Sequence, residues 1–435
     1  MLNSTRIPKM LLAFALLIGM GLQGCVTDNC GDLSYTHAVY TPEIMSSSDF
    51  RAAVEVQAPR AIKNPGKIYL KDQILILNEV GKGVHIIDNK NPENPQQLAF
   101  VRVPGNYDIA FNCDKMYLDS SVDLLVFDMS DPTRPSLLTR QENAFPHIVE
   151  YQGYTANPGE GIIVAWNKEI KTETYNCETG VPSLWEMNQV DPTTVDPQSF
   201  NTSRTINPAV AGKAGSMSRF TVLDDHMYVV LPRELVSYDV SNCANPVKLT
   251  TQELSLWNGV AEMVTSLNDL LLVGSSTGVM IYSTDNPEMP SFVSQFEHVQ
   301  ACDPVVAQGD YAYVTLRNGQ DQPCGNNFTN QLDILDIKNP ASPFLVTSYS
   351  MYNPHGLGLD NDLLFIADGK AGLKVYDATE PTKVGNKLLK HFDNMQGYDV
   401  IAHNGVLILT GEDGIAQYDY SNLDDIRLLS QLTVE

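Results

Sequence analysis

The sequence has little positive charge, few long apolar runs and none of the short motifs that mark common catalytic sites. It contains 28 Lys and Arg residues against 52 Asp and Glu residues, a formal net charge of −24. This charge makes nucleic acid and anionic lipid surfaces poor partners, and we expect no nucleic acid. The patterns H-E-x-x-H, G-x-x-x-x-G-K-[ST] and C-x-x-C-H are absent, which argues against zinc proteases, P-loop NTPases and c-type haem.

A long apolar run occurs only near the N-terminus. Arg6 and Lys9 precede the run MLLAFALLIGMGL, which is followed by small residues and Cys25. This order predicts a secretory signal over residues 1–24, followed by a tether over 25–49. No other apolar run approaches the roughly 18 residues that a membrane-spanning helix needs. Without the signal the chain keeps 26 basic and 52 acidic residues, a net charge of −26.

What the chain does contain is a phrase that returns seven times: an apolar strand that ends in Asp or Ser, then a turn that usually contains proline. The last residues of these strands are Asp88, Asp128, Asp239, Ser283, Asp336, Asp377 and Asp419. They are separated by 40, 111, 44, 53, 41 and 42 residues. Repeats of roughly 40 residues made only of short strands predict an all-β propeller of four-stranded blades over residues 50–435.

The long step of 111 residues leaves the number of blades open. We expect a hidden blade there, built from HIVEYQGY (147–154) and GIIVAWN (161–167), which makes eight blades in total. Seven blades is the alternative if this stretch is an elaborated loop. The rest of the step, about residues 169–215, lacks alternating apolar residues and is predicted to be an inserted loop that either binds a partner or decorates the surface.

The Asp residues that end the repeated strands have a structural explanation. An Asp or Ser side chain at a strand end accepts hydrogen bonds from the backbone N–H groups of the following turn. The Asn-Pro and Asp-Pro pairs then stop the strand. We therefore expect turns, and no catalysis, from these residues.

These phrases carry a family resemblance. GVHIIDNKNPENP, LVSYDVSNCANP and GLKVYDATEP resemble the LVIVD repeat, a motif of bacterial surface proteins predicted to be β-propellers. The resemblance covers about residues 50–435. Over this range the chain is similar to lipoproteins of Bacteroidota-type genomes. It implies the fold and a cell-envelope address, but no catalytic residue, because most of that family has no known function.

The N-terminal segment also resembles the lipobox of bacterial lipoproteins, because Leu22 lies three residues before Cys25. The resemblance implies that Cys25 carries acyl chains, palmitate among them, and begins the mature chain, and two or more such chains form a durable membrane anchor. An uncleaved anchor or an ordinary signal peptide is the alternative. Val26, in place of Asp, favours the outer membrane, on its periplasmic side or at the cell surface.

Six further cysteines are compatible with disulfides in an exported protein. Cys302 begins an innermost strand and Cys324 lies in a long loop of the same blade, so both are expected at one rim and paired. Cys113 and Cys243 fall on the opposite face, in different blades. The pairing of Cys30, Cys113, Cys177 and Cys243 stays open at this point.

The best candidate site is a ring of polar residues where the innermost strand of each blade begins, at the mouth of the central channel. Its members are Asp108, His147, Arg219, Glu262, Asp303, His355, Tyr398 and Asp399. Two imidazoles and several carboxylates suit a divalent cation or a positioned water. Polar side chains that only line a water-filled channel are the alternative.

Gly274-Ser275-Ser276-Thr277-Gly278 matches G-x-S-x-G, but a strand follows it in place of a helix, so we expect an ordinary hairpin loop. Taken together, the sequence favours a lipid-anchored extracytoplasmic binding or assembly module with a protein or glycan ligand and no resident cofactor. A metal-assisted hydrolase or lyase using His147, Asp303 and His355 is the alternative. A structural envelope protein is the third.

Overall fold

The computed structural model describes residues 33–146, 150–151, 154–155, 159–175, 213–214, 216–256, 259–298, 301, 304–317, 329–393, 396–411 and 413–435. The chain divides into two compact units. Unit 1 comprises Met1–His37 and Ile170–Val190, and only the ends of two strands in it are described. Unit 2 comprises Ala38–Glu169 and Asp191–Glu435. In the described part of the chain, no helix has the length and apolarity that a membrane crossing requires.

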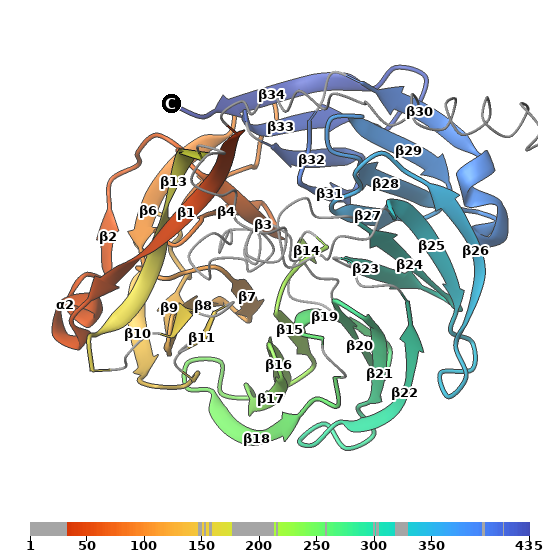
Figure 1. The fold of residues 1–435 in the computed structure, drawn as a ribbon. Helices are drawn as coiled ribbons and strands as arrows, with labels where there is room; N and C mark the ends of the chain where they lie inside the picture. Colours follow the sequence, from red (N-terminus) through yellow and green to blue (C-terminus); the bar gives the residue numbers. More distant parts are fainter. Residues whose placement is uncertain are drawn as a thin grey trace, which may run out of the picture. The chain divides into compact units, whose positions relative to one another are not determined.

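Unit 2 is a β-propeller of seven antiparallel four-stranded blades (Figure 1). Blades 1 to 3 consist of β3 (Pro65–Lys71), β4 (Ile74–Glu79), β5 (Gly83–Asp88) and β6 (Gln96–Arg102); β7 (Ile109–Asn112), β8 (Lys115–Ser120), β9 (Asp123–Asp128) and β10 (Ser136–Gln141); and β15 (Phe220–Leu223), β16 (His226–Leu231), β17 (Glu234–Asp239) and β18 (Val247–Glu253). Blades 4 and 5 consist of β19 (Ala261–Leu267), β20 (Leu270–Ser275), β21 (Gly278–Ser283) and β22 (Ser291–Glu297); and β23 (Val305–Gln308), β24 (Tyr311–Leu316), β25 (Gln331–Asp336) and β26 (Phe344–Ser350). Blades 6 and 7 consist of β27 (Leu357–Asp360), β28 (Leu363–Ala367), β29 (Leu373–Asp377) and β30 (Leu388–Phe392); and β31 (Asp399–His403), β32 (Val406–Gly411), β33 (Gly414–Asp419) and β34 (Arg427–Thr433).

The prediction of eight blades is wrong, and the seven-blade alternative is confirmed. In the stretch expected to form the extra blade, β11 (Glu150–Tyr151) pairs with β12 (Tyr154–Thr155) as an isolated hairpin. The next strand, β13 (Ile162–Tyr175), pairs with β1 (Leu33–Met45). Two-residue strands are too short to build a blade, and the longer strand takes its partner from the predicted N-terminal tether.

The apolar residues of this stretch are used to cover blade 2. Ile162 and Val164 are buried together with Val122 and with Phe50 of α2 (Ser47–Ala52). The chain then adds β2 (Glu55–Gln57) to the outer edge of blade 1, and β14 (Lys213–Ala214) to its inner edge. The N-terminal segment and the end of the insertion therefore extend the first blade on both sides.

The turn after each third strand is built as the sequence predicts. In all seven blades the terminal Asp or Ser accepts the backbone N–H of the residue two positions on, at 2.8 to 3.1 Å. The hydrogen bonds from Ser130, together with the ammonium of Lys115, lower the pKa of Asp128 to about 2. The prediction that these aspartates are structural is confirmed.

Apart from the cluster around Phe50, the described residues form seven apolar clusters, and each of the seven is shared by two neighbouring blades. The last of them joins blade 7 to blade 1 through Ile401 and Ile408 on one side and Ile68 and Leu77 on the other. Asn89 and Gln417 exchange two amide hydrogen bonds, at 2.9 and 2.7 Å, across the same seam. Two complete blades therefore meet through side chains at this seam, and the backbone N–H of Glu435 also donates to the carbonyl of Ile62 at 3.0 Å.

A β-bulge recurs at the start of every outermost strand. In four blades a Ser or Thr follows the bulge. Its hydroxyl donates to a backbone carbonyl in the proline-containing turn after the third strand of the next blade. These residues are Thr139, Thr250, Ser294 and Ser430. A bulge bends the strand and turns side chains toward a new direction, so the repeated phrase supplies both halves of this contact.

A disulfide between Cys113 and Cys243 joins blades 2 and 3, with the two Cα atoms 6.4 Å apart. Cys113 lies in the turn after β7, and Cys243 lies in the turn after β17. The bond therefore holds together the two blades that are separated in sequence by the insertion. Cys302 and Cys324, the predicted pair, lie outside the described residues.

We expect loss of this disulfide to destabilise the propeller. The bonded cysteines are 130 residues apart, and closing a loop of that length restricts the unfolded chain by about 3–5 kcal/mol. Denaturant unfolding of the Cys113→Ser, Cys243→Ser double variant should show this loss, and reduction of the wild-type protein should reproduce it. Equal stability of oxidised and reduced protein would contradict the expectation.

Candidate functional site

The predicted ring of polar residues lies where the innermost strands begin, which we call the channel mouth. The described members come from five blades, and they are Asp108, Arg219, Glu262, His355, Tyr398 and Asp399. His147 and Asp303 lie outside the described residues. The described members separate into an ion-paired group on blades 1 to 3 and a second group on blades 4 to 7.

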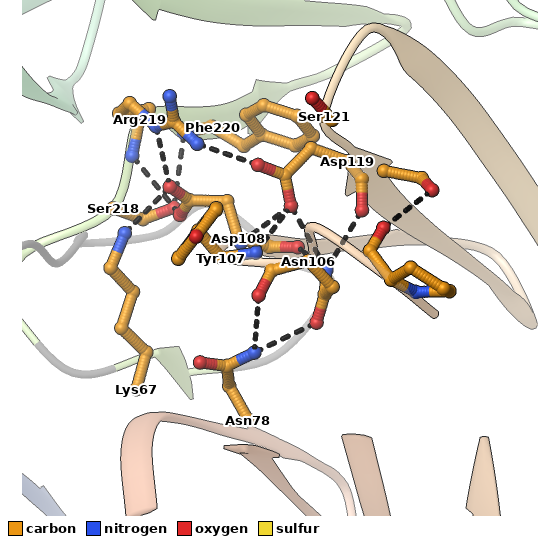
Figure 2. A network of polar contacts seen from close by, with 12 residues as sticks. Lys67, Asn78, Asn106, Tyr107, Asp108, Asp119, Ser121, Ser218, Arg219 and Phe220 are labelled. Carbon is orange, nitrogen blue, oxygen red and sulfur yellow. Dashed lines mark hydrogen bonds and ion pairs between the residues drawn. The ribbon is translucent and has the colours of Figure 1, made fainter. Parts of the chain in front are cut away.

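Asp108 is the centre of the ion-paired group (Figure 2). It is fully buried, and its Oδ2 accepts from Lys67 Nζ at 2.6 Å and from Arg219 Nε at 2.9 Å. Its Oδ1 accepts from the hydroxyl of Ser218 and from the backbone N–H of Arg219. Burial alone would raise the pKa of Asp108, but the charges of Lys67 and Arg219 outweigh it and lower that pKa. Both carboxylate oxygens are thus engaged by the protein itself.

Asp119, at the end of β8, extends the group and shapes the loop before β7. Its Oδ2 accepts from Arg219 at 2.6 Å. Its Oδ1 accepts from the backbone N–H groups of Tyr107 and Asp108 and from the side chain of Asn106 (Figure 2). Two cations and two carboxylates therefore balance one another in a buried site, which is the arrangement that buried charges need.

The sequence interpretation missed Lys67 and Asp119. Lys67 holds the same register position in blade 1 as Asp108 in blade 2, because Ile68 and Ile109 pair with equivalent residues of the next strand. Extending the strand alignment to the first blade would have found it. Asp119 is the next-to-last residue of β8, and Asp368 directly follows β28 in blade 6, one register position later. Each accepts two backbone N–H groups from the loop before the innermost strand of its blade. That recurrence was a usable signal.

The second group surrounds His355, which is buried at 8% exposure. Its ring lies 5.4 Å from the ring of Tyr398, and its Nε2 lies 3.2 Å from the side-chain amide of Asn353. Burial, together with the positive charge of Arg317, lowers the pKa of His355 well below its usual value, so the imidazole is neutral at pH 7. Its Nδ1 is buried without a hydrogen-bond partner.

Arg317 joins the second group from blade 5, and the sequence interpretation did not include it. It follows β24, and the side chains of Glu262 and Tyr398 act on it electrostatically. Glu262 is 3% exposed, whereas Arg317 and Tyr398 are half-buried. This side of the mouth therefore combines an aromatic ring, a neutral imidazole and a guanidinium.

Asp399, at the start of β31, is 1% exposed. Its Oδ1 accepts from the backbone N–H groups of Ser216 at 3.1 Å and Val400 at 2.9 Å. Its Oδ2 is buried and has no hydrogen-bond partner. Burial raises the pKa of Asp399 to about 7, although both N–H groups and the charge of Lys67 act in the opposite direction.

Within the described ranges, no group of three or more His, Cys, Asp and Glu side chains is placed to hold a metal ion. The hydrolase hypothesis depends on His147 and Asp303, which lie outside these ranges. The G-x-S-x-G segment forms the β20–β21 hairpin as predicted, and Ser276 Oγ accepts from the backbone N–H of Val260 at 3.1 Å.

The comparisons with known proteins agree with the fold. Residues 327–351 match the LVIVD repeat. The periplasmic gluconolactonase of Pseudomonas aeruginosa is similar over 85% of this chain and 97% of its own, with 8% identity and a TM-score of 0.52. A protein from Lactobacillus plantarum is similar over 85% of this chain and 96% of its own, with 10% identity and a TM-score of 0.52. These likenesses show the propeller architecture alone, and no curated protein sequence matches the chain.

We expect the ion-paired group to stabilise the fold. Asp108→Asn leaves Lys67 and Arg219 with one carboxylate fewer in a buried site, and breaking such a pair costs about 3–5 kcal/mol. Denaturant unfolding measures the loss. The matched control is Asp128→Asn, which keeps an oxygen for its exposed turn and should cost much less than Asp108→Asn. Equal losses of stability in the two variants would show that the buried ion-paired group stabilises the fold no more than an exposed turn does.

Asp399 should make stability depend on pH. Its pKa is about 7 in the folded chain and near 3.8 when unfolded, so the folded state holds the proton more tightly. The resulting stabilisation is complete below pH 4 and is lost as pH rises through 7, up to about 4 kcal/mol in total. The free energy of unfolding of wild type and of Asp399→Asn is measured at pH 5 and at pH 8. From pH 5 to pH 8 the wild type should lose more stability than the variant does. A pH-independent difference would contradict this assignment.

Proposed function

We propose that this LVIVD-repeat propeller is a lipid-anchored, extracytoplasmic binding or assembly module that contacts its ligand at the channel mouth. The predicted signal and Cys25 support the address, and the charge of −24 supports an exposed, well-hydrated surface. The propeller supports the mode of action, because it brings side chains of successive blades to one rim.

The observation that carries the proposal is the contact between His355 and Tyr398 on neighbouring blades, with ring centroids 5.4 Å apart. Gly356 N–H donates to the carbonyl of Tyr398 at 2.9 Å, which fixes the two residues relative to one another. A half-buried tyrosine offers a flat apolar face and a polar end, which suits both protein side chains and sugar rings. A neutral imidazole with an unpartnered Nδ1 adds a hydrogen-bonding group.

We expect ligand capture to depend on this pair. Affinity capture from an envelope extract should recover a specific partner with the mature wild-type protein. The His355→Ala, Tyr398→Ala double variant should capture at least about tenfold less of this partner, since each side chain would supply roughly 1 kcal/mol or more of binding energy. Phe344→Ala, at an exposed residue on the outermost strand of blade 5, is the matched control and should retain it. Unchanged capture by the double variant, with an unchanged melting temperature, would overturn the proposed site.

We also expect Cys25 to carry lipid. Mass spectrometry of the mature N-terminus from membranes should find an acylated Cys25, because two or more acyl chains make membrane attachment durable. Cys25→Ser should leave the chain unprocessed or release it from the membrane, whereas Cys30→Ser should change neither property. An unmodified mature N-terminus elsewhere in the chain would contradict the anchor.

A further inference from the structure

The chain crosses the channel mouth between the insertion and blade 3. The chain continues from β14, which pairs with β3, to β15 (Figure 1). On this path Ser216 bonds to Asp399 of blade 7 and Ser218 bonds to Asp108 of blade 2. Ser216, Met217 and Ser218 are all at most 3% exposed. A segment outside every blade is therefore as buried as the core.

Residues 216–218 are held by four different blades, and almost every contact uses backbone or hydroxyl groups. Ser216 N–H donates to Asp399 of blade 7, and Ser216 Oγ accepts from the backbone N–H of Leu357 in blade 6 at 2.6 Å. Ser218 donates its hydroxyl to Asp108 of blade 2, and its carbonyl accepts from Val264 N–H of blade 4 at 2.9 Å. The segment thus closes the mouth by bonding to residues of the predicted ring.

One of these contacts depends on protonation. Asp399 accepts from Ser216 with one oxygen, and its other oxygen is buried without a partner. Lys67 of β3 is bonded to Asp108, at the entrance to β7, at 2.6 Å, so its charge offsets only part of the cost of a negative Asp399. His355, before β27, carries no charge at pH 7. The other neighbours are the phenol of Tyr398, directly before Asp399, and the hydroxyl of Thr410 in β32.

We propose that residues 216–218 form a latch across the channel mouth, which is closed while Asp399 is protonated and released when Asp399 ionises. In the closed state a neutral carboxyl tolerates burial. Ionisation places a charge on a carboxylate whose Oδ2 has no partner in the closed state, and water solvates that oxygen when the segment moves away. Release would uncover the inward-facing groups of blades 2, 6 and 7. That a ligand then gains access to these groups rests on the proposed function.

Hydrogen exchange of the mature protein, followed by mass spectrometry or NMR from pH 4 to pH 9, tests the latch without any ligand. The reporting amides are Ser216, bonded to Asp399, and Leu357, bonded to Ser216. After correction for the intrinsic exchange rate, their protection in wild type should fall by up to about tenfold per pH unit as the pH rises toward 7, because opening releases one proton there. Above pH 7 it should level off, because Asp399 is then ionised in the closed state as well. Protection in Asp399→Asn should stay constant over the same range.

Two further measurements keep the test decisive. Ser216→Ala removes the contact with Leu357 and should lower protection at every pH without changing the pH dependence. The amide of Ile86, in the core of blade 1, should show no such change in any variant. Constant protection of Ser216 in wild type between pH 4 and pH 7, or the same pH dependence in Asp399→Asn, would overturn the latch. Failure of ligand capture would instead concern only the proposed function.

Discussion

Contact between neighbouring blades is the constraint on which the structure depends. Every apolar cluster of the ring is shared by two blades, so no single blade completes a core of its own. A sheet with apolar residues on both faces must be covered on both, and a ring achieves this without ends. The bulges, the hydroxyl groups that follow them and the proline-containing turns all act at these same contacts. The contacts between neighbouring blades therefore both stabilise the fold and position the channel mouth.

The sequence predicts the blades well because the repeat encodes local structure. Strands, hairpins and the Asp-capped turns follow from alternation and turn chemistry within a dozen residues. The number of blades was predicted wrongly, because apolar residues such as Ile162 and Val164 form a strand in either arrangement. Their partner, β1, lies more than 100 residues away, and local pattern cannot identify it. The disulfide was left open for the same reason: Cys113 and Cys243 had a predicted face but no predicted neighbour.

The candidate site was predicted in part. Placing polar residues at the start of each innermost strand led to Asp108, Arg219, His355 and Asp399, all of which lie at the mouth. What each residue does there depends on its partners in other blades. Asp108 is engaged by Lys67 and Arg219, whereas His355 keeps one nitrogen without a partner. The latch was not foreseeable, because each of its contacts joins residues that lie far apart in the sequence.

The central claim is that the ring is closed by contact between its first and last blades, and a double-mutant cycle on Asn89 and Gln417 tests it most directly. These residues are 328 positions apart and exchange two buried amide hydrogen bonds across the closing seam. The account predicts a coupling of about 1–2 kcal/mol between Asn89→Ala and Gln417→Ala in the free energy of unfolding. Additive effects of the two substitutions, with no coupling, would contradict a closed seven-bladed ring.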